Sequence, residues 1–513
     1  MTELQQAMQP LGVPARAGDR AWRISWPLAI GVYVFLMTLY RGHVDNILLL
    51  DGDTYWHIAT GQWILQHLAV PTADPFSHTM RGSPWTAQEW LSEVVFAAVH
   101  RAGGWTAVVA LTAASFAAAF VLLTRALLRK LDPLRAVLFV SLAVMMAIDH
   151  LLARPFVLAM PVMMAWMIGL VDAVDDGRSP SLWMLPLMAL WANLHGGFTL
   201  GVAVAAGFAA DGVFSAAPEK RMAMARKWGL FIILAVLAAL LTPHGVHGFL
   251  FTWQVLTQDT YALERITEWR SPNFHVFQGL EVWLLGGLAL LLHQGLRLPP
   301  VRIILLLGFL HLALKHGRNV ELLGMVSPLL VAKPFASQWA KLRPEGRQGS
   351  ANGPFQQLAR PAGYAASFCT LMALAGACVA LAHVHPVRLP EFTVPARPLA
   401  AAREARLLDG PVLNDYGYGG YLILAGIPPA IDGRTDMYRD DFIRRYFEAV
   451  ELTRPGALEE MLGRYRITWT LLRPGTPALT ALDRMPGWQR VYEDEKAVIH
   501  AQKIPPAGGK GTP

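Results

Sequence analysis

Several features of soluble proteins are scarce or missing in this sequence. Only 16% of its 513 residues are charged, and only two are cysteine. Cys369 and Cys378 lie nine residues apart in one apolar segment, about 13 Å along a helix, which is too far for a disulfide between them. The sequence contains neither a phosphate-binding P-loop nor an H-E-x-x-H zinc motif. The sequence therefore gives no support for a nucleotide-driven activity at the cytoplasmic side or for zinc chemistry of the H-E-x-x-H type.

What the sequence has in abundance is apolar residues. They make up 54% of the chain, and the mean hydropathy is +0.35, which excludes a soluble enzyme, a disordered chain and a coiled coil. About one residue in eight is charged over 1–384, against a quarter over 385–513. We expect a cytoplasmic N-terminus (1–23), a transmembrane domain (24–384) and a small extracytoplasmic α/β domain (385–513).

The apolar segments predict an α-helical polytopic membrane protein with about eleven spans. A span needs about 20 mostly apolar residues. The segments that meet this requirement, or come close to it, are 24–40, 105–124, 134–153, 155–174, 180–195, 197–214, 228–243, 279–296, 300–315, 319–334 and 363–384.

Charge decides the sidedness of these spans. Lys and Arg collect in cytoplasmic loops, and merging 180–214 into one span would place the basic cluster at 220–227 outside. We therefore predict two spans there, with the N-terminus inside and the C-terminal domain outside. The net charge of +7 is explained by these loops, so no nucleic acid is expected as a partner. The protein is predicted to be a multi-pass protein of the cell inner membrane with a periplasmic C-terminal domain.

The long first outer loop, 41–104, carries a distinctive acidic segment. Asp51 and Asp53 flank Gly52, and Asp53 can cap a short helix. Trp56 and Trp63 share a face of that helix, which suits the headgroup zone. We expect the helix to lie along the membrane surface and to hold both carboxylates at the mouth of the bundle. The alternative is that the two aspartates are only turn and cap residues.

Other polar residues gather at the outer ends of the predicted spans. Glu89 and Glu93 lie four residues apart, on one helix face, although a solvated face would look the same. Ionisable groups at membrane depth are costly and usually functional, while a single cation could simply snorkel. Cations beside carboxylates suit an anionic, lipid-linked substrate. The candidate substrate-binding residues are His57, Glu89, Arg154, His195, Arg270, Lys315 and Arg318.

The C-terminal domain should mix strands and helices. Short strands are predicted at 411–415, 421–424, 429–434, 467–472, 491–492 and 497–499, with a helix over 440–463. Polar and aromatic residues near its Gly-rich turn could bind sugar by hydrogen bonds and stacking, or could be structural turn residues. They are Asp432, Arg434, Asp436 and Tyr438, with Tyr416, Tyr418 and Tyr421 nearby.

Together these segments resemble GT-C integral-membrane glycosyltransferases, which have an acidic first outer loop, a polytopic bundle and an outward C-terminal domain. A similar and poorly characterised set of bacterial membrane proteins shares several runs with this chain. These runs are Asp51–His57, Pro71–Phe76, Trp85–Glu93, Arg154–Pro155, Trp191–Gly197, Glu268–Pro272, Arg318–Asn319, Gly419–Tyr421 and Ile431–Arg434.

This resemblance implies a hexosyl- or pentosyltransferase of surface polysaccharide or glycoconjugate synthesis. It would move a sugar from a polyprenyl-phosphate donor to a glycan or lipid-linked acceptor. The family's acidic residue acts as base or positions the acceptor hydroxyl, a role carried to Asp53, with Asp51 second. Cations would steady the departing phosphate, for which Arg154, Arg270, Lys315 and Arg318 are the candidates. No cofactor is implied with certainty, and a divalent cation stays open because Gly52 separates the two aspartates.

Two other classes of function fit parts of the pattern. A transporter of lipid-linked sugars would also carry outer charges, but it should show deep polar groups or repeated halves, and no internal repeat is found. A non-catalytic partner in polysaccharide assembly would use its outer domain for binding and would hardly depend on Asp53.

Overall fold

The computed structural model describes the whole chain except residues 1–20, 258–260, 262–264, 266–268, 342–352 and 504–513. Most of the predicted cytoplasmic N-terminus and Glu268 of the shared runs therefore lie outside the described residues. Seven described helices are long and apolar enough to cross a membrane, as expected for a multi-pass membrane protein.

All eleven predicted segments are helical, but not all have the length of a span. The seven long helices lie at Trp90–Leu128 (α4), Pro133–Ala147 (α5, continued by η2 Ile148–His150), Pro155–Asp175 (α6), Phe198–Ser215 (α8), Pro218–Ala239 (α9), Val320–Lys341 (α14, preceded by η5 Gly317–Asn319) and Tyr364–Val384 (α16). The shorter or less apolar ones are Trp26–His43 (α2), Leu185–Leu194 (α7, preceded by η3 Leu182–Met184), Gly279–Gln294 (α12) and Pro300–Lys315 (α13). A count of eleven spans stays a prediction.

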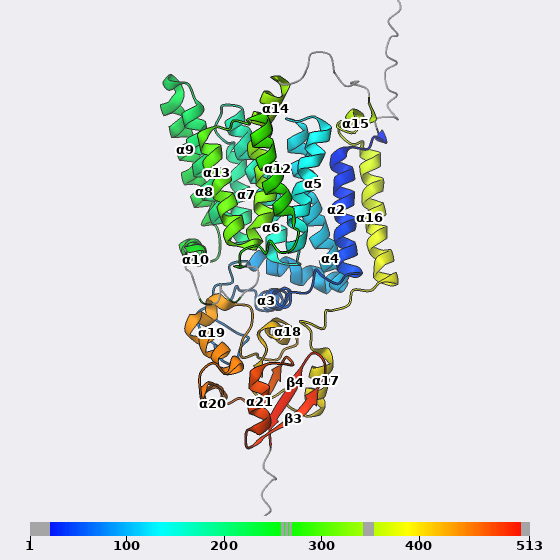
Figure 1. The fold of residues 1–513 in the computed structure, drawn as a ribbon, viewed down its shortest axis with the longest axis vertical. Helices are drawn as coiled ribbons and strands as arrows, with labels where there is room; N and C mark the ends of the chain where they lie inside the picture. Colours follow the sequence, from blue (N-terminus) through cyan, green and yellow to red (C-terminus); the bar gives the residue numbers. More distant parts are fainter. Residues whose placement is uncertain (1–20, 258–260, 262–264, 266–268, 342–352, 504–513) are drawn as a thin grey trace, which may run out of the picture.

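Two glycine-containing breaks shape the end of the bundle that faces the C-terminal domain, which is called the outer end below after its predicted side. The segment 180–214 forms two helices, α7 and α8, because the backbone is extended at His195 and two glycines follow it. Helix α4 bends at Gly103 and Gly104, and Gly104 has a φ of 60° that a residue with a Cβ rarely adopts. The first part of α4 thus runs across the end of the bundle before the helix turns into it (Figure 1).

The bundle buries one large apolar core and exposes apolar faces around it. Phe116, Phe120 and Trp166 are fully buried, and the Trp166 indole N–H donates to the carbonyl of Gly201 at 3.0 Å. Helix α16 lies at the edge beside α2 (Figure 1), and side chains such as Phe368 point outward with 65% of their surface exposed. Exposed apolar faces of this size suit contact with lipid.

A buried ion-pair network closes the end of the bundle away from the C-terminal domain. Arg302, at the start of α13, donates to Asp211 at 3.0 Å and to Asp175 at 2.5 Å, and also to the carbonyl of Leu330 at 3.2 Å. Lys130 adds a second cation at 2.6 Å from Asp175. Helices α6, α8 and α13 are held together by these contacts.

The C-terminal domain is a small α/β unit, as predicted. Its sheet has the strand order β1-β2-β4-β3, with β1 parallel to β2 and the other pairs antiparallel. The strands are Val412–Asn414 (β1), Trp469–Leu472 (β2), Trp488–Glu493 (β3) and Val498–Gln502 (β4). The helices are Ala396–Glu404 (α17), Gly419–Leu424 (α18), Thr435–Glu451 (α19), Ala457–Arg464 (α20) and Pro477–Arg484 (α21).

Three local predictions for this domain are wrong. The predicted helix over 440–463 is two helices, α19 and α20, and residues 429–434 form no strand. Residues 421–424 form part of the helix α18 and not a strand. Their apolar run is short, and a run of this length does not distinguish a strand from a buried helix. The 3-10 turn before it, η6 (Tyr416–Tyr418), is capped by the Asp415 side chain, which helps the chain to enter a helix.

The acidic helix lies between the two parts of the protein. Helix α3 (Asp53–His67) and the first part of α4 lie at the end of the bundle that faces the C-terminal domain (Figure 1). Trp56 is 9% exposed and packs in the core of the C-terminal domain, so the expectation that it faces headgroups is wrong. The outer loop 41–104 therefore forms part of the surface against which the C-terminal domain packs.

Candidate active site between the bundle and the C-terminal domain

The acidic pair of the first outer loop is held by one arginine. The Arg154 guanidinium forms ion pairs with Asp51 through Nε and with Asp53 through Nη2. Asp51 also accepts a hydrogen bond from the backbone N–H of Asp53 at 3.0 Å, and the Trp56 indole N–H donates to Asp53 Oδ1 at 2.9 Å. The two predicted catalytic carboxylates and Arg154 therefore form a single cluster.

Backbone contacts bring Arg154 to the aspartates. The residue before it, Ala153, donates its N–H to the carbonyl of Leu48 at 2.9 Å. The carbonyl of Ala153 accepts from the Thr54 hydroxyl at 3.0 Å. Pro155 then starts α6, and its ring keeps the preceding Arg154 extended at φ −123° and ψ 160°. The arginine is thus fixed at the outer end of a long helix.

The backbone of the C-terminal domain touches this cluster. A Cβ at Gly420 would clash with the carbonyl oxygen of Gly52, and a Cβ at Gly433 would clash with Asp53 Oδ1. Only glycine permits such an approach. The Gly-rich turn of the domain is therefore part of the wall of the site.

A second cluster, made of carboxylates and histidines, lies beside the first. Glu89 precedes α4 and lies 3.3 Å from His195 Nε2 and 3.6 Å from His57 Nε2. His57 Nδ1 lies 3.1 Å from Glu93 Oε1. Glu93 is 1% exposed, so Glu89 and Glu93 face the protein interior and do not form a solvated helix face.

Short hydrogen bonds hold Glu89 next to the turn that carries His195. The Ser92 hydroxyl donates to the carbonyl of Leu194 at 2.7 Å, and the Trp90 indole N–H donates to Asn193 at 2.8 Å. The start of α4 is thus fastened to the end of α7. This arrangement places the two predicted substrate-binding residues opposite each other.

Burial shifts the pKa values of this second cluster. Burial raises the pKa of Glu89 to about 7, although Arg318 and Arg154 act against it. Burial, followed by the same two arginines, lowers the pKa of His195 to about 3, and burial lowers the pKa of His57 well below its usual value. Both imidazoles are therefore neutral at pH 7, and Glu89 exchanges a proton near that pH.

The three remaining predicted cations come from the outer ends of α12–α14. Arg318, in η5, stacks 4.6 Å above the Trp269 ring and acts electrostatically on Glu89 and His195. Arg270 and Lys315 are exposed. Their backbone carbonyls accept hydrogen bonds from Gly317 and Ser271, which pairs the two loops. Arg318 joins the cluster, whereas Arg270 and Lys315 lie next to it in chain and space.

Part of the expected sugar-binding surface of the C-terminal domain is structural. Arg434 is 1% exposed and donates to Asp432 and, at 2.7 Å, to Asp74 of the outer loop. Its guanidinium stacks 4.7 Å from the Trp85 ring, and the Tyr438 hydroxyl donates to Asp432 at 2.7 Å. Side chains buried this completely cannot touch a sugar, so the expectation for Asp432, Arg434 and Tyr438 is wrong. They fasten the domain to the loop.

Two other residues of the same set do lie at the site. Asp436, near the start of α19, is exposed, and Asp53 is among the charges that act on it. Burial, then Asp53 and Asp51, raise the pKa of Tyr416 well above its usual value. Asp53 therefore acts electrostatically on both of these side chains of the C-terminal domain.

The residues do not fit a divalent cation. Within the described ranges, no group of three or more His, Cys, Asp or Glu side chains is arranged to hold a metal ion. Arg154 lies between the two aspartates and already neutralises them.

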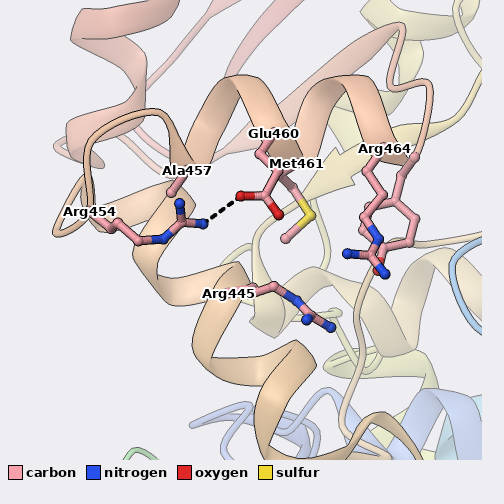
Figure 2. A pocket seen from close by; sticks show the side chains of 7 residues that line it. Arg445, Arg454, Ala457, Glu460, Met461 and Arg464 are labelled. Carbon is pink, nitrogen blue, oxygen red and sulfur yellow. Dashed lines mark hydrogen bonds and ion pairs between the residues drawn. The ribbon is translucent and has the colours of Figure 1, made fainter.

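Two surface hollows lie apart from these clusters. The one in Figure 2 is lined by residues of α19 and α20, among them Arg445 and Arg464, and Arg454 there donates to Glu460 at 2.8 Å. The other, of about 450 Å³, lies between α3 and α4 and is lined by Gln62, Leu65, Gln66, Ala97 and Arg101. Neither contains a predicted site residue.

Sequence reasoning missed the burial of Glu93 and the role of Asp74. The carboxylate spacing of Glu89 and Glu93 is equally typical of a solvated face, and Asp74 stands in an ordinary Asp-Pro turn. The glycines at 420 and 433 were the available signal, because a glycine next to polar residues can mark a close approach of two backbones.

Comparison with known proteins shows similarity in structure alone. No protein-family model and no curated protein matches the chain. The oligosaccharyltransferase of Archaeoglobus fulgidus in its apo form aligns with 87% of this chain and 69% of its own, at a TM-score of 0.54 and 11% identity. ArnT from Cupriavidus metallidurans bound to undecaprenyl phosphate aligns with 94% and 98%, at a TM-score of 0.46 and 14% identity. The chain thus shares the GT-C fold of the first protein, as the sequence resemblance implied.

Proposed function

We propose that this protein is a membrane glycosyltransferase. It moves a sugar from a polyprenyl-phosphate donor to a glycan or lipid-linked acceptor at the outer face of the bacterial inner membrane. The observation that carries the proposal is the pair Asp51 and Asp53, held by Arg154 between the bundle and the C-terminal domain. The fold shared with an oligosaccharyltransferase supports the same class of reaction.

In the proposed reaction, the acidic pair orients the acceptor. Asp53, with Asp51 second, accepts a hydrogen bond from the acceptor hydroxyl and directs its oxygen at the anomeric carbon. Tyr416 and Asp436 contact sugar from the side of the C-terminal domain. These contacts hold the donor and the acceptor in one complex, so that the transfer takes place between two bound reactants.

The arginines serve the leaving group. Transfer breaks the bond between the anomeric carbon and the phosphate oxygen, so negative charge grows on the lipid phosphate. Arg318 and Arg154, with Arg270 and Lys315 at the rim, are the proposed cations that stabilise this charge. The N-terminus is cytoplasmic and the C-terminal domain periplasmic in this proposal, which fits a role in surface polysaccharide or glycoconjugate synthesis.

The test compares surface glycans of the source organism in wild type, in a deletion strain and in deletion strains rescued with variants at equal membrane level. We expect the deletion to alter one glycan. We expect Asp53→Asn to fail to restore it because the amide cannot orient the hydroxyl in the same way. Asp409→Asn, which changes an exposed aspartate of the C-terminal domain, is the matched control and should restore the glycan fully.

Two other outcomes would contradict the proposal or the role of Asp53. Unchanged glycans in the deletion strain would contradict the proposed function. Full rescue by Asp53→Asn would remove Asp53 from the reaction and favour an assembly partner or transporter, unless Asp51→Asn then fails in its place.

A further inference from the structure

We propose that Glu89 accepts the proton of the acceptor hydroxyl, and that His57 and His195 hold its carboxylate in position for this step. The inference rests on the glycosyl transfer proposed above. It gives the aspartates and Glu89 separate tasks: the aspartates orient the hydroxyl, and Glu89 removes its proton.

The aspartates are poorly placed to take a proton themselves. Both oxygens of Asp53 already face donors, since the Trp56 indole N–H is 2.9 Å from Oδ1 and Arg154 is paired with Oδ2. Asp51 is engaged in the same way by Arg154 and by the backbone N–H of Asp53. A carboxylate that already accepts hydrogen bonds from charged and neutral donors weakens these bonds when it takes up a proton. Protonation of either aspartate is therefore unfavourable.

Glu89 has the opposite surroundings. Its Oε1 lies 3.3 Å from His195 Nε2, and its Oε2 lies 3.6 Å from His57 Nε2, which is beyond hydrogen-bond distance. Water reaches 24% of its side chain. One oxygen of Glu89 is thus lightly engaged and accessible, as a proton acceptor must be.

The tautomer of His195 follows from its backbone contact. The N–H of Gly197 donates to His195 Nδ1 at 3.0 Å, so Nδ1 accepts and a neutral ring carries its proton on Nε2. The Nε2 atom, which carries this proton, lies 3.3 Å from Glu89 Oε1. His195 therefore contacts the glutamate through Nε2 without adding a charge.

His57 lies on the other side of the glutamate, and its own position is fixed by neighbouring side chains. It is 4% exposed, and its Nδ1 lies 3.1 Å from Oε1 of the buried Glu93. The Trp56 ring packs against the imidazole, with ring centres 3.6 Å apart. The ring has little freedom to turn, so His57 and Glu93 act as positioning residues for Glu89.

Charged and titratable groups face Glu89 from every element packed around it. They are His57 and Asp53 from α3, Glu93 from α4, His195 from the turn between α7 and α8, Arg154 at the start of α6, Arg318 from η5 and Asp436 from α19. The two arginines favour the carboxylate, while burial and the two aspartates favour the protonated form. Together these opposing effects place the pKa of Glu89 in the physiological pH range, where a general base is most effective.

The proposed step is balanced in atoms and charge. The acceptor oxygen forms a bond to the anomeric carbon as the bond from that carbon to the phosphate oxygen breaks. The electron pair of the broken bond leaves with the lipid phosphate. The proton of the acceptor hydroxyl passes to Glu89, which later releases it to water.

The first arm of the test is a pH profile of glycan formation. Membranes of the deletion strain supply donor and acceptor, and wild type, Glu89→Gln, Glu89→Asp or Glu460→Gln is expressed in them. Because the carboxylate is the active form, the wild-type rate should rise with pH through about pH 7. Glu89→Gln should lose about 10²–10⁴-fold above pH 7, and this loss should shrink at lower pH, where wild-type Glu89 is itself protonated. Glu89→Asp should keep a residual, pH-dependent rate.

Glu460→Gln is the matched control. Glu460 is an exposed glutamate that pairs with Arg454 on the C-terminal domain, in the hollow of Figure 2. Exposed ion pairs of this kind contribute little to stability, so the control should keep the wild-type rate and profile. Asp436→Asn is a second comparison, because the charge of Asp436 favours the protonated form of Glu89. It should move the midpoint slightly below the wild-type value without flattening the profile.

The second arm needs no substrate and measures thermal unfolding of purified wild type and Glu89→Gln. The pKa of Glu89 rises from 4.5 to about 7 on folding, so its charged form lowers stability as pH rises between these values. Glu89→Gln should therefore unfold at a higher temperature than wild type at pH 8 and at the same temperature at about pH 4.

The two arms separate the failure of this inference from the failure of the proposed function. A wild-type rate in Glu89→Gln, a flat wild-type profile near pH 7, or a flattened profile in Asp436→Asn would overturn the role of Glu89. Equal unfolding of wild type and Glu89→Gln at both pH values would do the same. If the deletion leaves every glycan unchanged while the unfolding difference is present, the proposed function fails and Glu89 is only a titrating group.

Discussion

Two arginines at opposite ends of helix α6 each bind a pair of aspartates. Arg154 binds Asp51 and Asp53 at the outer end, and Arg302 binds Asp175 and Asp211 at the other end. The 21 residues of α6 separate the two centres by about 30 Å. The residue types are the same, yet the two centres differ in what surrounds them.

The inner centre is closed and the outer centre is open. The Arg302 side chain is 4% exposed, and its partners Asp175 and Asp211 are 5% and 2% exposed, with Lys130 completing the charge balance. The corresponding values are 13% for Arg154, 16% for Asp51 and 21% for Asp53. In the inner centre, every charged group is buried against an opposite charge, and this network holds the helices together. In the partly exposed outer centre, a charged group can replace a contact with the protein by a contact with substrate.

Breaking the closed centre should have the largest effect on stability. Arg302→Met leaves Asp211 buried without its guanidinium partner. Removing one member of a buried ion pair costs about 3–5 kcal/mol. Thermal unfolding in detergent should show a large loss, while glycan formation per folded molecule should stay at the wild-type value. A loss of specific activity at unchanged stability would contradict the structural role of this centre.

Opening the contact between the domain and the outer loop should have a smaller effect on stability. Gly420→Ala places a methyl group against the carbonyl oxygen of Gly52, and overpacking of this kind costs about 1–3 kcal/mol. The outer centre should lose activity because its wall moves, whereas the inner centre should be unaffected. The matched control is Gly463→Ala in α20, where a Cβ meets no atom within 4 Å. Equal activity of the two variants would show that the domain does not form part of the site.

Much of the fold could be predicted from the sequence because the signals were local. Apolar length marked the helical segments, and the basic cluster at 220–227 correctly separated α7 from α8. The composition of residues 385–513 indicated a small α/β domain, which the four-stranded sheet confirms. The short apolar run at 421–424 misled, because length and burial were the same for a strand and a helix.

The site was harder to predict because its geometry depends on contacts between distant segments. Asp53, Arg154, Glu89 and His195 were selected by their outer position and chemistry, and the fold places them together. No periodicity could show that Arg434 pairs with Asp74, 360 residues away. Arg434 was a sugar-binding candidate from its sequence position, but it is buried and has a structural role. Glu93 was compatible with a solvated helix face, but its side chain faces the protein interior.

The most direct measurement compares Arg154→Lys with Arg302→Lys for glycan formation per folded molecule and for thermal unfolding. Lysine keeps the charge but cannot bridge two carboxylates with a planar guanidinium. We predict that Arg154→Lys loses on the order of 10²-fold in glycan formation at nearly wild-type stability, and that Arg302→Lys is destabilised but keeps its specific activity. Wild-type glycan formation by Arg154→Lys, or the reverse assignment of the two effects, would contradict the account.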